Sequence, residues 1–254
     1  KGAQVNLTNT ASFGNLTAYN NAGNYELATI SAISGSVISF QNGILRNYTA
    51  LSAIQLVRVP VYDDVNIVGT LSAADWNGST GGILAFKADV VTFSADIDLS
   101  GKGFRGGNAG NYPSSCPTGT GTSLYYSDTL SGKGGAKGEG IVILTSGYLA
   151  CRGKAFNGGG GGNDHNAGGG GGANGGGGGV AGENDEAFFS CPGSPGFASL
   201  APDQTMAADK LFLGGGGGAG HGNNNNGTDG GDGGGLVLIE ANQIIGNSHS
   251  IISN

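Results

Sequence analysis

The stretch FNGGGGGNDHNAGGGGGANGGGGGVAGEN, residues 156–184, holds three blocks of five glycines, and a fourth block lies in LFLGGGGGAGHGNNNNGTDGGDGGG, residues 211–235. Glycine loses more conformational freedom on folding than any other residue, so an isolated glycine block stays a coil. Polyglycine II helices, in contrast, point their amides and carbonyls outward and can hydrogen-bond to one another side by side. Four blocks of one length, each about 15 Å long at a rise of about 3.1 Å per residue, predict a polyglycine II helix bundle. The alternative is that the blocks are disordered loops between strand repeats.

The composition excludes several classes of protein. Charged residues make up only 11% of the chain and the net charge is -7, so no basic stripe is present for nucleic acid or an anionic membrane. Glycine shows no G-X-Y period, which excludes collagen. Abundant Asn, Ser, Thr and Gly disfavour helices, and no apolar run approaches the length of a membrane span. We therefore predict no nucleic-acid partner and no membrane insertion. The chain begins without Met, and we expect a mature or excised piece of a longer secreted protein.

The rest of the sequence predicts an all-β fold in two domains. Within residues 1–80, the part from 24 to 72 alternates β-branched or aromatic residues with polar ones, which predicts a β-meander, a small β-barrel or sandwich that is incomplete at its N-terminus. Within residues 81–254, three segments each open with Gly and an apolar strand pattern, and they are 82–107, 140–162 and 235–254. They predict β-solenoid-like strand repeats beside the polyglycine II helix bundle.

The inserts between the glycine blocks are expected to be loops on a rigid scaffold, where recognition usually occurs. They span 108–131, 163–167, 180–210 and 221–232. We expect ligand contacts from aromatic and imidazole side chains in them, namely Tyr125, Tyr126, Phe188, Phe189, His165 and His221. Acidic side chains on flexible glycine-rich loops offer oxygen ligands for calcium, and the candidates are Asp164, Glu183, Asp185, Asp229 and Asp232. Their spacing fits neither an EF-hand nor the nine-residue glycine-aspartate repeat.

The three cysteines have different surroundings. Cys116 and Cys191 each precede Pro in a loop, and they are predicted to form a disulfide in an oxidising compartment. Cys151 lies in an apolar pattern and is predicted to be a small buried hydrophobe. The alternative is three unpaired thiols.

No motif in the sequence indicates an enzyme. GKGFRG at 101–106 matches a dinucleotide-binding pattern, but GNAGNYPSSCPTG follows it and cannot begin the helix that such a site requires. Asp96 and Asp98 share one face of a strand, as on an ordinary solvated surface. A polysaccharide-cleaving enzyme would need two carboxyl groups about 5–10 Å apart in a cleft. The histidines show no paired spacing, so we predict that the chain is not an enzyme.

Several stretches carry a resemblance to a known family. They are KGAQVNLTNTASFGNLTAYNNAGNYELATISAISG, QLVRVPVYDDVNIVGTLSA, GGILAFKADVVTFSADIDLSGKGFRGG and LGGGGGAGHGNNNNGTDGGDGGGLVLIEA. Together they resemble the glycine-rich β-domain of large surface proteins of Bacteroidota that the type IX secretion system exports, gliding-motility adhesins among them. SDTL at 127–130 is similar to the O-glycosylation signal of secreted Bacteroidota proteins, which makes Thr129 a candidate for modification.

The resemblance implies export, an extracellular location at the cell surface, and adhesion as part of a longer chain. We therefore predict a secreted cell-surface adhesin module that displays recognition loops on a polyglycine scaffold and binds a glycan or a surface. The alternative is a purely structural module of a surface filament or secretion-associated assembly, whose partners are proteins: its parent chain or its filament neighbours.

Overall fold

The computed structural model describes residues 1–48, 53–111, 123–129, 132–182, 193–202, 209–222 and 225–254. In this part of the chain the fold is broadly all-β. It contains no α-helix, and η2 (Ser146–Tyr148) is a single 3-10 turn. No helix among these residues has the length and apolar character needed to cross a membrane.

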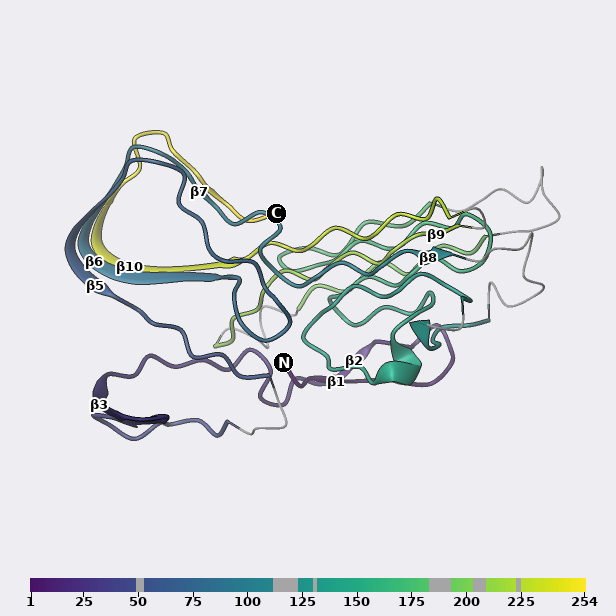
Figure 1. The fold of residues 1–254 in the computed structure, drawn as a ribbon, viewed down its shortest axis with the longest axis horizontal. Coiled ribbons are helices and arrows are strands. Elements are labelled where there is room, and N and C mark those ends of the chain that lie inside the picture. Colours follow the sequence, from purple (N-terminus) through teal and green to yellow (C-terminus); the bar gives the residue numbers. More distant parts are fainter. Residues whose placement is uncertain (49–52, 112–122, 130–131, 183–192, 203–208, 223–224) are drawn as a thin grey trace.

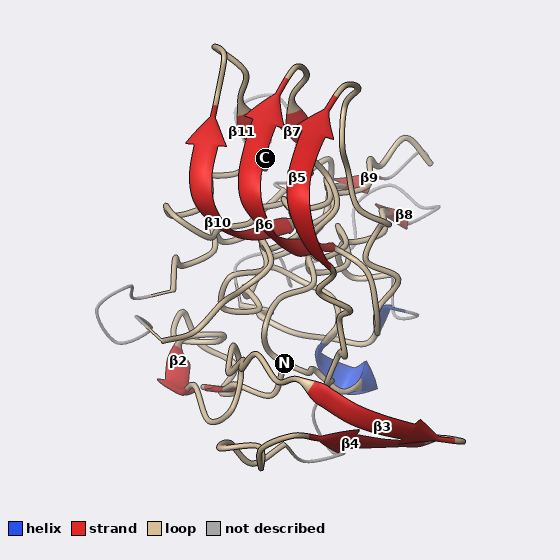
Figure 2. Ribbon diagram, turned by 90° about the vertical axis from the view of Figure 1, so that its left-hand side faces the viewer, coloured by secondary structure: helices blue, strands red, loops and turns tan. Residues whose placement is uncertain are grey.

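One sheet contains the longest strands. It has three parallel strands in the order β10 (Leu236–Ile245), β6 (Ile83–Phe93) and β5 (Val61–Ile67), and it curves strongly at one end of the molecule (Figures 1 and 2). After a turn, β7 (Ile97–Asp98) pairs in parallel with β11 (Ile251–Ile252), and Leu71 bridges Ile97 on the other side. Three segments, from β5 to Leu71, from β6 to β7 and from β10 to β11, therefore run side by side both before and after the turn.

Alternation of side chains explains how this part packs. Val91, Ile97 and Leu99 are fully buried between the two layers, together with Ile67 and Phe93. Every side chain of β10, which is an edge strand, is exposed or half-buried.

The register of the sheet corrects the predicted repeat. Leu236 pairs with Ile83, so segments 82–107 and 235–254 do stack. Segment 140–162 does not join them, and β5 takes the third position instead. The sheet thus crosses residue 80, where the sequence predicted a domain boundary.

The other described strands of residues 1–80 form two separate antiparallel pairs. β1 (Gln4–Val5) pairs with β2 (Leu16–Ala18), and β3 (Ile30–Ser34) pairs with β4 (Val37–Phe40) in a hairpin that projects below the sheet (Figure 2). Within the described part of residues 1–80 these strands do not close into a barrel.

The remaining chain runs back and forth in extended segments that lie side by side (Figure 1). Successive amides of block 158–162 donate to three different segments at 2.9 to 3.0 Å: Gly159 to Gly216, Gly160 to Phe197, Gly161 to Cys151 and Gly162 to Ala219. The first and last acceptors are three residues apart in one segment. The direction of donation therefore repeats every three residues.

Block 214–218 follows the same rule in the interior of this array. Its donors and acceptors, at 2.8 to 3.0 Å, are Gly215 to Ala173, Gly216 to Glu139, Gly217 to Gly231 and Gly218 to Gly170. Again the first and fourth bonds reach one segment, so each interior block is held by neighbours on several sides.

Close approach of the backbones is the reason that these residues are glycine. The described glycines with positive φ all lie outside the four blocks, so the blocks do not need glycine for its backbone conformation. A Cβ at Gly172 would lie 1.9 Å from the Gly215 carbonyl oxygen, and one at Gly159 would lie 1.9 Å from that of Gly170. Block 175–179 is packed on one side only: a Cβ at Gly175, Gly176 or Gly179 would meet nothing within 4 Å, whereas one at Gly178 would lie 2.0 Å from the Gly171 carbonyl oxygen.

Segments without five-glycine blocks also belong to the array. Gly196 donates to the Gly168 carbonyl at 2.9 Å and Gly230 to that of Gly107 at 2.8 Å. The predicted loops 180–210 and 221–232 were therefore too long at their C-terminal ends. A short strand pair, β8 (Gly110–Asn111) with β9 (His221–Gly222), lies at the far end of the array (Figure 1).

Candidate functional site

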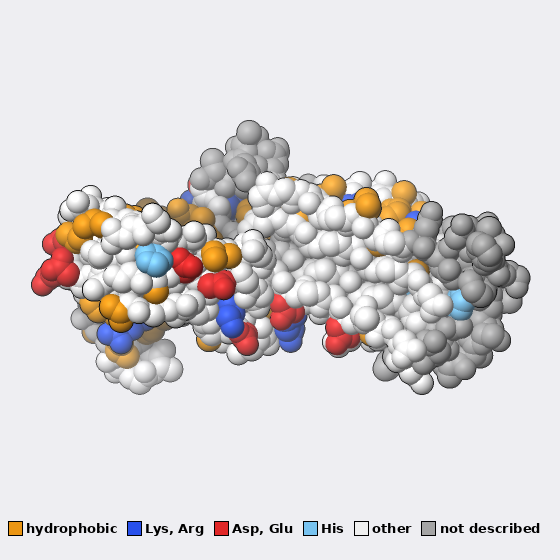
Figure 3. Space-filling view, turned by 90° about the horizontal axis from the view of Figure 1, so that it is seen from above, with side chains coloured by type: hydrophobic (Ala, Val, Ile, Leu, Met, Phe, Trp, Pro, Cys, Tyr) orange, Lys and Arg blue, Asp and Glu red, His pale blue; other side chains and the backbone are white. Residues whose placement is uncertain are grey.

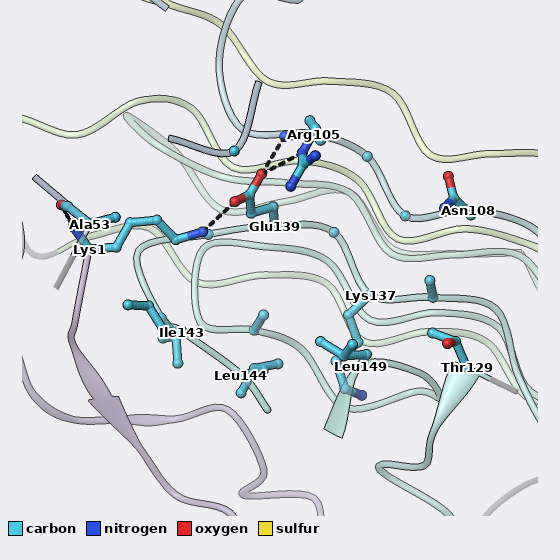
Figure 4. Close-up of a pocket in the computed structure, with 18 residues that line it drawn as sticks. Lys1, Ala53, Arg105, Asn108, Thr129, Lys137, Glu139, Ile143, Leu144 and Leu149 are labelled. Atoms are coloured by element: carbon cyan, nitrogen blue, oxygen red, sulfur yellow. Dashed lines mark hydrogen bonds and ion pairs between the residues drawn. The ribbon is translucent and has the colours of Figure 1, made fainter. Parts of the chain in front are cut away.

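A groove of about 660 Å³ lies on the side of the array that faces the N-terminal segment (Figure 4). Its floor is made by glycine backbone of segments 105–108 and 136–140. One wall is polar and carries Lys1, Arg105 and Glu139, whereas the other is apolar. The volume falls within the range of small-molecule sites, about 300–1,000 Å³.

Glu139 is the centre of the polar wall. It forms an ion pair with the Lys1 ammonium, and its Oε2 accepts from Arg105 Nε at 3.1 Å and from Trp76 Nε1 at 3.0 Å. Burial acts to raise the pKa of Glu139, but the Lys1 ammonium and the Arg105 guanidinium outweigh it and hold that pKa below its usual value. Glu139 is therefore a carboxylate at neutral pH.

Arg105 brings an accessible cation to the groove. Its side chain is 55% exposed, whereas that of Lys1 is only 10% exposed. The guanidinium lies against Gly78, where a Cβ would come within 2.8 Å of Nη2, and Nη1 reaches the Asn77 carbonyl at 3.4 Å. Two cations, Lys1 and Arg105, therefore surround the Glu139 carboxylate, and the Asp232 carboxylate binds the Gly106 amide on the outer edge of the same segment.

The apolar wall comes from the segment around η2. Ile141 and Val142 are buried, and the next residue, Ile143, is 49% exposed toward the groove. Leu149, just after η2, is 37% exposed. Asn108 and Thr129 add an amide and a hydroxyl at the other end of the groove (Figure 4), so the predicted modification site, Thr129, lies on the groove's rim.

Lys137 also lines the groove, but its Nζ points into the protein. Nζ lies within hydrogen-bond distance of three carbonyl oxygens, those of Tyr125 at 2.6 Å, Cys151 at 2.7 Å and Gly153 at 2.6 Å, and 4.8 Å from the centre of the Phe13 ring. Burial lowers the pKa of Lys137 to about 7. This side chain ties three segments together and contributes no charge to the polar wall.

The tyrosines expected to bind ligand are packed against the scaffold. Tyr126 lies 4.7 Å from Tyr148 and 5.5 Å from Phe13, measured between ring centres. Tyr125 lies 5.5 Å from Phe197. Both tyrosines are half-buried, so each presents part of a ring to solvent.

The histidines expected at the ligand are also inside the array. His221 is buried, with Nε2 2.9 Å from the Gly132 carbonyl and Nδ1 in contact with that of Asp164. His165 is 8% exposed, and its Nε2 lies 3.2 Å from the Asn166 amide nitrogen. These rings occupy the end of the array next to β9.

The acids expected to bind calcium have other partners where the structure describes them. Asp232 accepts a hydrogen bond from the Gly106 amide at 2.7 Å, and Asp229 accepts one from the Ala109 amide at 2.6 Å. Both carboxylates therefore serve as acceptors for amides along one edge of the same segment. Asp164 is buried. In the residues with a described position, no group of three or more His, Cys, Asp or Glu side chains could hold a metal ion.

Some predicted residues cannot be placed. Cys116, Cys191, Phe188, Phe189, Glu183 and Asp185 lie outside the described residues. Cys151 is buried, as predicted, and its Sγ lies 3.0 Å from Ser127 Oγ; burial raises the pKa of this thiol.

The sequence interpretation missed the groove itself. Arg105 and Glu139 lie in GFRGG and GEGI, where a charged residue interrupts glycine in a chain that has few charges. That interruption was the available signal.

Comparison with protein-family models, with curated proteins and with solved structures gave no match.

Proposed function

We propose that this chain is a secreted cell-surface adhesin module in which a polyglycine II helix bundle serves as a rigid support for ligand recognition. The observation that carries the proposal is the threefold repeat of hydrogen-bond direction along blocks 158–162 and 214–218. A helix of this type has three residues per turn, and such bonding to several neighbours would give glycine segments the order that they lack alone. The in-register parallel segments of β5, β6 and β10 support the β-solenoid-like part of the proposal.

The groove is the recognition site in this proposal. It combines an exposed guanidinium, an amide and a hydroxyl with an apolar wall, which is the mixture that a polar, partly apolar ligand such as a glycan requires. The rigid floor keeps these groups in place before the ligand arrives, so little ordering cost is added on binding.

The resemblance to type IX-secreted surface proteins gives the cellular setting of the proposal: export from a Bacteroidota cell, attachment at its surface, and a role beside gliding-motility adhesins. In that setting the parent chain or filament neighbours hold the module, and a surface glycan is its ligand.

A binding experiment tests the proposal. The intact domain is applied to immobilised polysaccharides alongside two double variants, Ile143→Ser with Leu149→Ser in the groove and Val68→Ser with Val180→Ser elsewhere. The second pair is 78% and 91% exposed, so it controls for loss of surface apolar area. We expect wild type and the control pair to bind and the groove pair to lose binding. Equal binding by all three proteins, or binding by none, would remove the groove from the function.

A second function has an observation of its own. Exposed apolar side chains gather in the N-terminal part of the chain, with Ile33 at 67%, Val37 at 63%, Leu45 at 93% and Leu56 at 65% exposure. In addition, β5 and β10 are the two edges of their sheet, and such edges can pair with another chain. A purely structural module would bury these surfaces, and self-association in sedimentation without polysaccharide binding would favour it.

A further inference from the structure

We infer that the groove recognises a saccharide that carries a carboxylate, such as a uronic-acid segment of an acidic polysaccharide. This inference rests on the proposed adhesin function and names its ligand class. It depends on three features of the groove: its exposed Arg105 guanidinium, its apolar wall and the state of its backbone amides.

The positive charge of Arg105 favours a ligand that carries an anionic group. Arg105 uses Nε to bind Glu139, and Nη1 makes only a 3.4 Å contact with the Asn77 carbonyl. The outer edge of this half-exposed guanidinium can therefore donate to a carboxylate, the geometry for which arginine is suited. Seen from above, most of the glycine-run surface carries neither apolar nor charged side chains, and acidic and basic side chains lie together along one edge (Figure 3).

The apolar wall selects the rest of the ligand. Ile143 and Leu149 face the polar wall across the glycine floor. A sugar ring has an apolar face of C–H groups and a rim of hydroxyls, and it can place the first against this wall while the rim meets Asn108 and Thr129. A simple inorganic anion would leave the wall uncovered.

The backbone of the groove argues against an extended peptide. Peptides that bind by their main chain need an unpaired edge. Six amides of the floor segments are already used: those of Gly106, Gly107, Ala136, Lys137, Gly138 and Glu139 donate within the protein. Recognition must therefore come from side chains, which suits a saccharide better than a strand.

The test measures binding of the intact domain to trimers of galacturonate, mannuronate and glucuronate, each beside its neutral methyl ester. Triglutamate serves as an acidic peptide, and neutral polysaccharides are run in the same assay. We expect at least one uronate trimer to bind, tenfold or more tightly than its ester, with an affinity that falls as salt rises. Triglutamate should bind at least tenfold more weakly.

Variants separate charge from folding. Arg105→Gln should weaken uronate binding by tenfold or more and leave the ester unaffected, whereas Arg105→Lys should fall between it and wild type. Arg46→Gln removes a cation from another surface ion pair, with Asp209 at 3.0 Å, and should bind like wild type. If Arg105→Gln does not fold, the salt dependence of wild-type binding decides, because only the uronate should respond.

Failure takes two distinguishable forms. Binding of neutral polysaccharide alone, or equal binding of a uronate and its ester, would overturn the carboxylate inference and leave the adhesin proposal intact. Tight binding of triglutamate would also overturn it, in favour of a peptide. Absence of binding to every saccharide would overturn both.

Discussion

Alanine at Gly215 should disrupt the glycine array. The added Cβ would lie 1.8 Å from the Asn157 carbonyl oxygen and 2.5 Å from its carbon. Atoms of this kind normally stay about 3.5 Å apart, so the two segments would have to separate by more than 1 Å, on the order of 1.7 Å.

The cost follows from the hydrogen bonds that such a shift breaks. The bonds from Gly159 to Gly216 at 2.9 Å and from Gly215 to Ala173 at 3.0 Å lie beside the clash. Breaking a buried bond leaves groups unpaired at a cost of about 1–3 kcal/mol, so two broken bonds cost about 2–6 kcal/mol. Since each kcal/mol shifts the melting temperature of a chain of this size by about 2–4 °C, we expect a loss of roughly 5–20 °C.

Gly176→Ala is the matched control. It makes the same chemical change in another five-glycine block, but nothing lies within 4 Å of the new Cβ and φ is not positive. It should leave the unfolding free energy within about 1 kcal/mol of wild type. Differential scanning calorimetry of both variants decides the matter. If Gly215→Ala melted at the same temperature as Gly176→Ala, the described close packing of the segments would be contradicted.

Three further predictions concern other contacts. Burial lowers the pKa of Lys137 to about 7 from 10.5, so between these values the unfolded chain holds a proton that the folded chain lacks, and the unfolding free energy should rise with pH by about 1.4 kcal/mol per unit. In urea titrations from pH 7 to 9, the slope should be smaller by about 1.4 kcal/mol per pH unit in Lys137→Met than in wild type or in the exposed control Lys133→Met. An unchanged slope would assign it to other groups, such as the N-terminal amine, whose pKa burial also lowers. Asp232→Ala should lower the unfolding free energy by only about 0.5–1.5 kcal/mol, because the Gly106 amide loses its acceptor at an exposed site that water can reach. Thermal melts with and without EDTA should agree, whereas a metal-dependent difference would indicate a calcium role for Asp232. Trp76→Phe removes the donor to Glu139 and should cost about 1–3 kcal/mol in chemical unfolding, a loss that would be absent if this bond did not form.

The four glycine blocks could be recognised from the sequence because repeated blocks of five glycines, all of one length, have few structural uses. The other members of the array were missed for a physical reason. In an extended segment with three residues per turn, only every third residue must be glycine to face a neighbour closely. Gly135 and Gly138 are spaced in this way, and so are Gly193 and Gly196; each would place a Cβ within 2.4 Å of a carbonyl oxygen. A search for glycine at this spacing would have found them.

The sheet was harder to predict. Segment 140–162 shares the opening Gly and apolar residues of its supposed partners, yet its residues pack toward the N-terminal segment, where Ile141 joins Tyr19 and Trp76 in a core cluster. Local pattern identifies strands but not the strand beside them. Likewise, Asp229 and Asp232 look like metal ligands by composition, whereas their role as amide acceptors depends on a segment about 120 residues away.

Amide hydrogen exchange, measured residue by residue by NMR, tests the proposed scaffold most directly. The amides of Gly159, Gly170 and Gly216, which donate inside the array, should exchange slowly and with the free energy of global unfolding. The amide of Gly176, in block 175–179, should exchange far faster, because this glycine has no close neighbour. If the interior glycine amides exchanged as fast as those of an unstructured chain, the blocks would be linkers and the proposed scaffold would not exist.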